Sequence, residues 1–414
     1  MKTAPNKAPL IVLLFCLVVL PLAAQTGKFY STNNELSSSL INQIFQDKRG
    51  FIWIATEYGL NRFDGLRFSN YKHMSGDSTS IKNNYVRTLY EDSRQNLLVG
   101  CIDGLMKYDS ETDTFREIPM IRAGKQVFPH VTQMQKLHNG EIWAVTTGQG
   151  IFRLDEEKQQ AVSIDAIMKQ VNYNFQSNLY EDSDYNIWIG TEGHGLICYL
   201  PATQEVRIFR YPAINDNYVS AIGEDKYGNL FIGTQKHGLS RYDREQNRFV
   251  PVPYTGSEEL SIYCLTLVDD HLLIGTDGQG LKTYNRMTGK IEDYSINSAP
   301  LDFSEGKIHA ILEDRDKNLW LGLFQRGIAL IPKQENPFEY YGNKSIYYNP
   351  IGQGCVMSIY QDSNHHLWVG TDNEGVYELS AEGKRLRHYQ PGSSPRSVAN
   401  TIMCMYEDTN GDFW

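Results

Sequence analysis

The chain of 414 residues is acidic, with 39 Lys and Arg against 49 Asp and Glu and a net charge of −10. This charge disfavours nucleic acid and anionic lipid as partners, because both would be repelled. Hydrophobic residues make up 41% of the chain, aromatic residues make up 12%, and there are 34 glycines. Such a composition is typical of a globular protein rich in strands and tight turns, with room for two or three domains of roughly 150 residues.

Residues 1–24 have the layout of a secretory signal. Lys2 and Lys7 precede an apolar run of eleven residues, and Pro21-Leu22-Ala23-Ala24 follows it. We expect cleavage after about Ala24. The alternative is an uncleaved anchor helix, although eleven apolar residues are fewer than the roughly 20 that span a bilayer. Both interpretations place the rest of the chain outside the cytoplasm, and we expect a periplasmic location.

Cysteine usage gives no sign of a metal site or a disulfide framework. Cys16 lies in the signal, and the other five cysteines form no CxxC pair: Cys101, Cys198, Cys264, Cys355 and Cys404. Because most of them lie in apolar runs, we expect small buried side chains, no metal and no cofactor.

A unit of about 45 residues recurs along the rest of the chain. The segment from Phe45 to Gly65 returns from Tyr90, from Tyr180 and from Leu312. Its bulky anchor residue occurs at intervals of 42 to 48 residues, as Trp53, Leu98, Trp143, Trp188, Phe231, Leu273, Trp320, Trp368 and Trp414. Each unit shows four short runs with period two, such as residues 86–90, 97–100, 105–108 and 114–118. The pattern excludes a helical solenoid and predicts an all-β fold of four-stranded antiparallel β-propeller blades.

Three positions in each unit receive structural roles. An aspartate lies six residues before most anchors, as Asp47, Asp92, Asp182, Asp225, Asp314, Asp362 and Asp408. We expect these carboxylates to cap backbone N–H groups of a turn, because one per blade cannot converge on a calcium ion. A glycine follows the second strand and is expected to have positive φ, as Gly59, Gly104, Gly150, Gly195, Gly238, Gly280, Gly327 and Gly375. The Trp anchors are expected to pack between blades.

The segments GFIWIATEYGLNRFDG, DYNIWIGTEGHGL, KNLWLGLFQRGI and HHLWVGTDNEGV resemble two-component regulator propeller repeats. These repeats build the extracytoplasmic sensors of hybrid two-component systems in Bacteroidetes, and the resemblance covers almost everything after the signal. It implies an N-terminal portion of a sensor histidine kinase that senses glycan fragments and works as a homodimer. The kinase would lie beyond residue 414, so no enzyme activity is expected of the chain as given. Membrane contact would come only from that missing part or from an uncleaved signal.

Two segments of the chain share one layout, a short aromatic strand, a loop and then the first strand of a blade. They are residues 27–47 and residues 337–362. An N-terminal strand often completes the last blade of a propeller, so Phe29 and Tyr30 are expected to pair into the seventh blade. We therefore expect a seven-bladed propeller over residues 25–335 and an unfinished second propeller over residues 336–414. A single eight-bladed ring is the alternative.

Candidate ligand-binding residues lie on one face of the ring if the first strand of each blade is innermost. Four consecutive blades have an aromatic residue or histidine thirteen residues before the anchor, as Tyr85, His130, Phe175 and Tyr218. The turns between second and third strands add Tyr58, Glu192, His194, Lys236, His237, Gln325 and Arg326. Aromatic faces beside polar groups suit an oligosaccharide. The alternative is that these rings are buried between blades, which side-chain exposure tests.

The most favoured function is a ligand-binding sensor domain that recognises an oligosaccharide or another small periplasmic molecule. One alternative is a secreted propeller lyase or glycosidase, which needs carboxylates, Tyr, His or Arg converging near the ring axis. The sequence shows no such set, since His130, His194, His237 and His309 fall one per blade without metal-type spacing. A protein-interaction scaffold is the other alternative.

Overall fold

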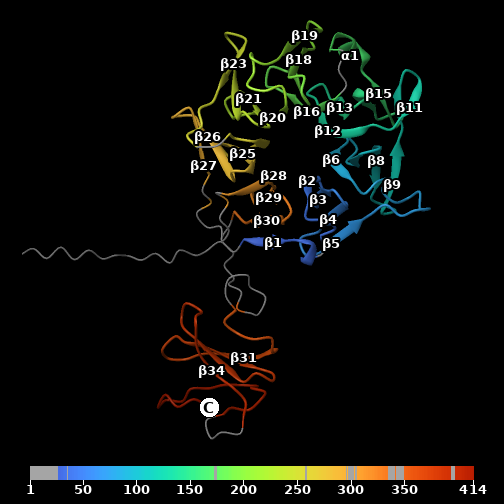
Figure 1. The fold of residues 1–414 in the computed structure, drawn as a ribbon. Helices are drawn as coiled ribbons and strands as arrows, with labels where there is room; N and C mark the ends of the chain where they lie inside the picture. The colour runs from blue at the N-terminus through green and yellow to red at the C-terminus, as the bar shows by residue number, and fades with distance from the viewer. Residues whose placement is uncertain are drawn as a thin grey trace, which may run out of the picture. The chain divides into compact units, whose positions relative to one another are not determined.

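The computed structural model describes residues 27–34, 36–171, 175–256, 259–294, 296, 303, 305–333, 341, 349–392 and 397–414. The chain separates into two compact units, residues 1–335 and residues 336–414 (Figure 1). The predicted signal, residues 1–24, lies outside the described residues, as do residues 337–340 and 342–348 of the second aromatic segment.

The first unit consists of consecutive antiparallel blades, each with its strands in chain order from the inside outward. The first two blades contain β2 (Ile41–Gln46), β3 (Ile52–Thr56), β4 (Gly59–Phe63) and β5 (Phe68–Tyr71), then β6 (Val86–Glu91), β7 (Leu97–Cys101), β8 (Gly104–Asp109) and β9 (Thr114–Ile118). The third contains β12 (His130–Lys136), β13 (Ile142–Thr147), β14 (Gly150–Asp155) and β15 (Gln160–Ser163), extended by β10 (Met120–Arg122) and β11 (Lys125–Val127).

The remaining blades of the first unit follow the same plan. They contain β16 (Gln176–Glu181), β17 (Ile187–Thr191), β18 (Leu196–Leu200) and β19 (Glu205–Phe209), then β20 (Val219–Glu224), β21 (Leu230–Thr234), β22 (Leu239–Asp243) and β23 (Arg248–Pro251). After them come β24 (Ile262–Val268), β25 (His271–Gly278), β26 (Leu281–Asn285) and β27 (Lys290–Asp293), and last β28 (Gly306–Glu313), β29 (Leu319–Leu323) and β30 (Gly327–Ile331). A 3-10 turn (Thr32–Asn34) and the helix α1 (Asp165–Val171) complete the unit among its described residues.

The innermost strands form a closed ring. They contact one another in the order β2, β6, β12, β16, β20, β24 and β28, and β28 contacts β2 again. Figure 1 shows the blades arranged around this axis. The predicted all-β propeller fold is confirmed.

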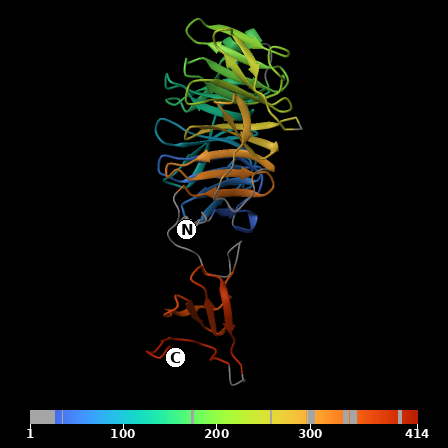
Figure 2. The same ribbon diagram turned by 90° about the vertical axis from the view of Figure 1, so that its left-hand side faces the viewer.

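The ring is closed by the N-terminal strand β1 (Lys28–Tyr30). It pairs antiparallel with β30, with Phe29 opposite Ala329 and Tyr30 opposite Ile328. Figure 2 shows β28, β29 and β30 of this blade, in orange, side by side. The prediction that Phe29 and Tyr30 pair into the seventh blade is confirmed.

The repeated aspartate holds the turn and also the anchor. In the fourth blade, Asp182 Oδ1 accepts the backbone N–H groups of Asp184 at 3.0 Å and Asn186 at 2.8 Å, as the capping prediction requires. Its Oδ2 accepts the indole N–H of Trp188 at 2.8 Å, a bond that the sequence analysis did not predict. The same indole bond joins Asp47 to Trp53, Asp314 to Trp320, Asp362 to Trp368 and Asp408 to Trp414.

Two of the blades without this Asp–Trp pair keep one of its two partners. Where the anchor is Phe231, the side-chain amide of Asn229 donates to Asp225 Oδ2 at 2.8 Å. The third blade lacks the aspartate, and there Glu141 Oε2 accepts the indole N–H of Trp143 at 2.9 Å. A buried donor is thus satisfied in each case, as buried polar groups require.

The anchors fill the space between blades in the first unit. Trp53 is fully buried and belongs to one cluster with Val86, Leu89 and Tyr108 of the second blade. The packing prediction is wrong for Trp414, which is 75% exposed. The buried anchors Trp53, Trp188 and Trp320 pack in clusters with residues of the blade that follows them around the ring.

The eight repeated glycines all have positive φ, as predicted. The requirement is strict at Gly195, where φ is +85° and a Cβ would lie 2.1 Å from the carbonyl oxygen of Phe209. The hydroxyl of Thr191 fixes the turn by donating to the Gly195 carbonyl at 2.7 Å. Only glycine fits such a close approach.

The second unit contains one blade, β31 (Val356–Gln361), β32 (Leu367–Thr371), β33 (Val376–Leu379) and β34 (Arg385–Tyr389), among its described residues. Val369, Tyr377 and Leu379 form its small core. By contrast, Met357 and Ile359 of β31 are 40% and 64% exposed. The inner strand of this blade therefore lacks the cover that the ring gives to inner strands in the first unit.

Candidate functional site

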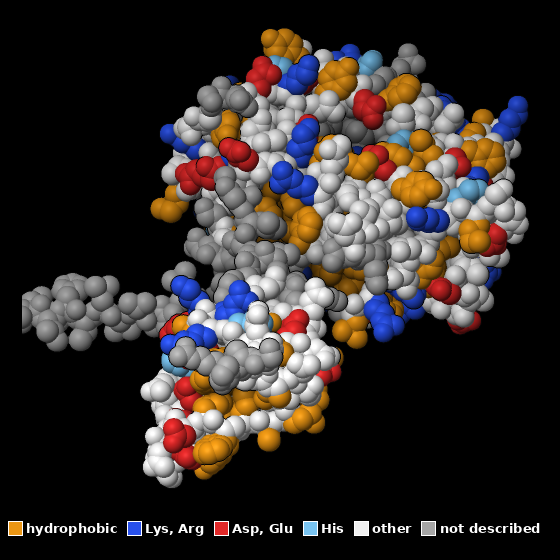
Figure 3. All heavy atoms as spheres, turned by 60° about the horizontal axis from the view of Figure 1, so that its bottom comes forward, with side chains coloured by type: hydrophobic (Ala, Val, Ile, Leu, Met, Phe, Trp, Pro, Cys, Tyr) orange, Lys and Arg blue, Asp and Glu red, His pale blue; other side chains and the backbone are white. Residues whose placement is uncertain are grey.

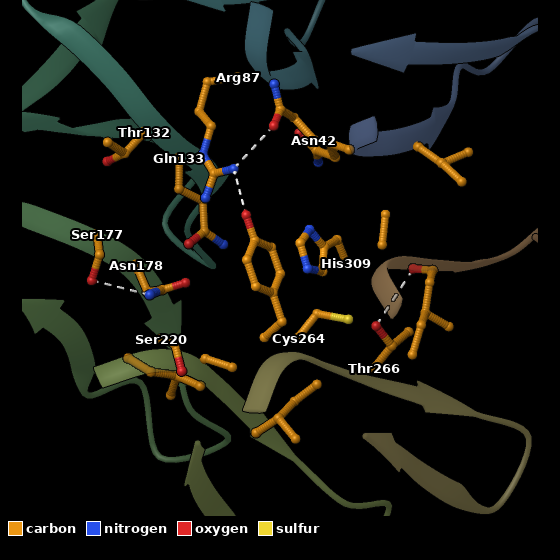
Figure 4. A pocket seen from close by; sticks show the side chains of 18 residues that line it. Asn42, Arg87, Thr132, Gln133, Ser177, Asn178, Ser220, Cys264, Thr266 and His309 are labelled. Carbon is orange, nitrogen blue, oxygen red and sulfur yellow. Dashed lines mark hydrogen bonds between the residues drawn. The ribbon is translucent and has the colours of Figure 1, made fainter. Parts of the chain in front are cut away.

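A β-bulge interrupts the innermost strand of each blade in the first unit. The pairing register skips one residue at the same place each time, and the skipped residues are Asn42, Arg87, Thr132, Ser177, Ser220, Tyr263 and His309. Bulges re-aim side chains and are common beside functional sites. All seven side chains are polar, and all seven line a cavity of about 220 Å³ on the ring axis (Figure 4).

Four of the bulged residues connect neighbouring blades. Each donates to the backbone carbonyl that precedes the bulge of the next blade: Asn42 to Val86 at 2.8 Å, Thr132 to Gln176 at 3.0 Å, Ser177 to Val219 at 2.9 Å and Ser220 to Ile262 at 2.5 Å. Their polarity is therefore explained by the architecture of the ring.

Arg87, Tyr263 and His309 make no such connection among the described residues and form a cluster instead. The rings of Tyr263 and His309 are stacked, with centroids 3.7 Å apart and planes 3° from parallel. Arg87 Nη1 donates to Tyr263 Oη and to Asn42 Oδ1, both at 3.3 Å (Figure 4). We call Arg87, Tyr263 and His309 the axial cluster.

An ion-pair network supports the axial cluster from the sixth and seventh blades. Asp277 Oδ1 lies 3.2 Å from His309 Nε2 and 2.9 Å from Lys307 Nζ. Burial raises the pKa of Asp277, but the hydrogen bonds from Lys307 and His309 lower it by more, so the carboxyl stays ionised. Burial lowers the pKa of His309, against the smaller effect of Asp277, which keeps the imidazole neutral near pH 7.

We expect the thermal stability of the protein to fall as the pH drops below 6.5. Burial lowers the pKa values of His130 and His309 from 6.5, and the charge of Arg87 lowers that of His130 further. The unfolded chain then binds more protons than the folded one, so unfolding becomes easier as the pH falls below about 6.5. Melting temperatures measured at decreasing pH should fall less steeply for the His130→Gln/His309→Gln variant than for the unmodified protein. An equal slope in both proteins would contradict the assignment.

A second cavity, of about 340 Å³, lies at the mouth of the axial one and shares Arg87 and Tyr263 with it. It is also lined by Glu192, Tyr218 and Lys236, three residues predicted from the sequence. The mouth thus combines an aromatic ring, a carboxylate and an ammonium group with the guanidinium at the axis.

The four predicted rings differ in exposure. Phe175 and Tyr218 are 44% and 49% exposed. Tyr85 and His130 are half-buried and meet edge to face, with centroids 5.6 Å apart. The four rings are therefore not all buried between blades, which was the arrangement that would have excluded a binding role.

The other predicted residues lie away from the axis. His194 is exposed, and Tyr58, Gln325 and Arg326 are exposed and line neither axial cavity. His237 lines a separate cavity of about 470 Å³ with Lys236 and Tyr211, and its Nδ1 lies 3.2 Å from Asp216 Oδ2. From the turn before Arg326, it is Phe324 that contacts the axial cluster, 4.8 Å from the His309 ring.

The sequence analysis missed the axial cluster, and its statement that no convergent set exists near the axis is wrong. A signal for it was present eleven residues before the anchors, where Asn42, Arg87, Thr132, Ser177, Ser220 and His309 are all polar. Tyr263 lies ten residues before Leu273, because the sixth blade has a shorter turn.

A family comparison matches the same part of several blades. The profile described as two component regulator propeller matches residues 35–58, 170–193, 213–236, 302–325 and 350–373. These five segments of the chain match the two-component regulator propeller repeat. The match at 35–58 spans the bulge at Asn42, the capping Asp47 and the anchor Trp53.

Similar proteins include signalling proteins of Bacteroidetes. The chain is 40% identical over 74 residues to histidine kinase P4 of Formosa agariphila, and the match covers 17% of this chain and 5% of that protein. The extracellular domain of a hybrid two-component system from B. thetaiotaomicron has 25% identity and a TM-score of 0.65, over 94% of this chain and 52% of that one.

The extracellular domain of a one-component system from the same organism has 22% identity and a TM-score of 0.60, over 94% and 51% of the two chains, and shows the shared fold. The chain thus spans about half the length of these domains. Among its described residues, no helix is both long and apolar enough to cross a bilayer.

Proposed function

We propose that this chain is the ligand-binding extracytoplasmic part of a hybrid two-component sensor, which recognises an oligosaccharide and signals to a histidine kinase in a homodimer. The proposal is supported by the propeller repeats and by the likeness to the extracellular domain of a hybrid two-component system. The observation that carries ligand binding is the mouth cavity, where the exposed ring of Tyr218 lies among Glu192, Lys236 and Arg87. Sugar-binding sites combine such groups, because the C–H faces of a sugar pack on aromatic rings and its hydroxyls form hydrogen bonds with charged groups.

We further propose that residues 336–414 begin a second propeller, which completes the sensor region. β31 has its bulge at Met357, the position that Arg87 occupies in the second blade. The hydroxyl of Ser358 donates to the carbonyl of Ile402 at 2.8 Å. Ile402 lies twelve residues before Trp414, as Val86 does before Leu98, so this bond corresponds to the blade-to-blade connections of the first unit.

Replacing Tyr218 by Ala is expected to weaken oligosaccharide binding about tenfold, because a stacked aromatic contact contributes on the order of 1 kcal/mol. Calorimetric titration with a panel of neutral and acidic oligosaccharides measures this, with Phe175→Ala as a second variant. Tyr227→Ala is the matched control, since Tyr227 lies beyond the other end of β20 and is 55% exposed. Unchanged affinity in both Phe175→Ala and Tyr218→Ala would remove the mouth as the binding site.

A lyase is the second candidate, and the axial cluster is the observation that favours it. Arg87, Tyr263 and His309 are the residue types that such an enzyme needs close together near the axis. Incubation with acidic oligosaccharides, followed by the ultraviolet absorbance of unsaturated products, tests it. Turnover that is lost in Tyr263→Phe would favour the lyase over the sensor, and absence of product would leave binding as the role of the site.

A further inference from the structure

The guanidinium of Arg87 is only partly used by the protein. Its five N–H groups form a planar fork, and both hydrogen bonds that it makes to described residues come from Nη1. The N–H groups of Nη2 and Nε donate to no described residue, and no described carboxylate forms an ion pair with Arg87. Arg244 offers a contrast, because it is 30% exposed and pairs with Asp182, Asp184 and Glu224.

The surroundings of Arg87 add positive charge. Lys236 lines the same mouth cavity and forms no ion pair with any described residue, whereas Lys307 is paired with Asp277. Of the charged residues that line the two cavities, Arg87 and Lys236 balance Glu192 and Asp277, and Lys307 adds one positive charge through its ion pair with Asp277. His130 and His309 add none near pH 7, because burial lowers the pKa of both. On the face that Figure 3 shows, acidic and basic side chains are interspersed over the first unit.

A second group without a partner lies at the start of the innermost strand of the third blade. His130 Nε2 is buried and has no hydrogen-bond partner among the described residues, and Arg87 is close enough for its charge to lower the pKa of this histidine. A buried imidazole nitrogen without a partner is costly in a folded protein. Arg87 lines both axial cavities, so its Nε and Nη2 N–H groups are available to an acceptor on a ligand.

We propose that the axial cluster is the subsite for the carboxylate of a uronic-acid sugar, with the Nε and Nη2 edge of Arg87 as its anchor. The inference rests on the proposed function and names the class of oligosaccharide. A planar carboxylate matches the edge of a guanidinium with two parallel hydrogen bonds. The sugar ring that carries it would reach the mouth, where Tyr218 and Glu192 lie.

The test compares acidic oligosaccharides with their neutral methyl esters, which differ only at the carboxylate. Oligomers of galacturonate, glucuronate and mannuronate, each with its ester, are titrated calorimetrically into the purified protein. We expect an acid to bind and its ester to bind about 10- to 100-fold more weakly, as the loss of a charged hydrogen-bond pair implies. Arg87→Met should weaken the binding of the acid by the same factor and leave the affinity for the ester unchanged. Arg87→Lys should recover only part of the affinity, because lysine lacks the fork.

Two further variants separate binding from folding. Arg248→Met makes the same charge change at an exposed position on β23 and should bind like the unmodified protein. Tyr263→Phe removes one partner of Arg87 Nη1 while keeping the stacked ring. It should weaken the binding of the acid less than Arg87→Met does. Melting temperatures identify any variant that fails to fold.

The outcomes distinguish the inference from the proposed function. Equal affinity for an acid and its ester, or full affinity in a folded Arg87→Met protein, would overturn the carboxylate subsite while the oligosaccharide sensor stands. Binding of sulfated oligosaccharides but of no uronate would also overturn it. If no oligosaccharide of the panel binds, acidic or neutral, both the inference and the proposed function fail.

Discussion

Deleting Lys28–Tyr30 is expected to lower the free energy of unfolding of the first unit by about 5 kcal/mol and its melting temperature by about 10 °C. The deletion removes the pairing of β1 with β30 and leaves β30 as the unpaired edge strand of the seventh blade. It also removes the Tyr30 ring, which lies 5.4 Å from Phe63 and 5.2 Å from Phe68 and is stacked on Trp320 at 6.3 Å. Burial raises the pKa of Tyr30 to about 12, in keeping with its position in this core.

The measurement is a thermal melt followed by circular dichroism. Tyr30→Ala should account for about half of the loss, because it removes the ring but keeps the backbone pairing. Lys28→Ala is the matched control, since Lys28 is exposed on the same strand. A deletion variant that melts within about 2 °C of the unmodified protein would show that β1 does not hold the ring closed.

Asp182→Ala is expected to cost about 4 kcal/mol of unfolding free energy, because one buried carboxylate satisfies several donors at once. It accepts the indole N–H of Trp188 at 2.8 Å, the backbone N–H groups of the turn and Arg244 Nη1 at 3.2 Å. Alanine would leave the indole donor buried and unpaired. Denaturant unfolding followed by Trp fluorescence measures the loss.

Two variants at this turn isolate the indole bond. Asp182→Asn keeps one oxygen for the backbone but places an amide N–H₂ toward the indole N–H, so it should cost about half as much as alanine. Asp184→Ala removes an exposed carboxylate that also contacts Arg244, and should cost less than about 1 kcal/mol. Equal effects of Asp182→Ala and Asp184→Ala would contradict the role given to the indole bond.

The propeller could be predicted from the sequence because each blade is specified locally. The capping aspartates, the positive-φ glycines and the anchors are repeated about every 45 residues, and each acts within its own blade or on the next one. Ring closure was also predictable, because Phe29 and Tyr30 are aromatic residues in a short strand before the first blade. The hydrogen bonds from the Trp indoles to the aspartates were not predicted. Asp182 and Trp188 are six residues apart, and turn capping and packing between blades already accounted for each of them separately.

The axial cluster could not be predicted from alternation, because a bulge shifts the alternation of a strand by one residue. In a regular strand, alternation would place Arg87 on the face opposite to Val86 and on the same face as Leu89. The bulge at Arg87 breaks this alternation. The cluster also depends on closure of the ring, since Arg87 and Tyr263 are 176 residues apart in the chain. Repeat symmetry indicates equivalent positions in every blade, and it does not indicate which three of seven side chains meet at the axis.

Only part of the mouth cavity was predicted from the sequence, because the position of a residue in the repeat does not determine its distance from the axis. Glu192, Tyr218 and Lys236 come from the fourth and fifth blades, whose turns face one cavity. Tyr58 and Arg326 occupy equivalent turns in the first and seventh blades, but they are exposed and line neither axial cavity. Position within a repeat therefore predicts the face of a residue and not its distance from the axis.

A crystal structure of the protein with a uronate oligosaccharide that it binds tests the central claim most directly. We expect the sugar at the mouth of the ring, with a carboxylate within hydrogen-bond distance of Arg87 Nε and Nη2 and a sugar ring against Tyr218. A ligand bound instead beside His237 and Tyr211, or on the second unit, with none at Arg87, would contradict the account.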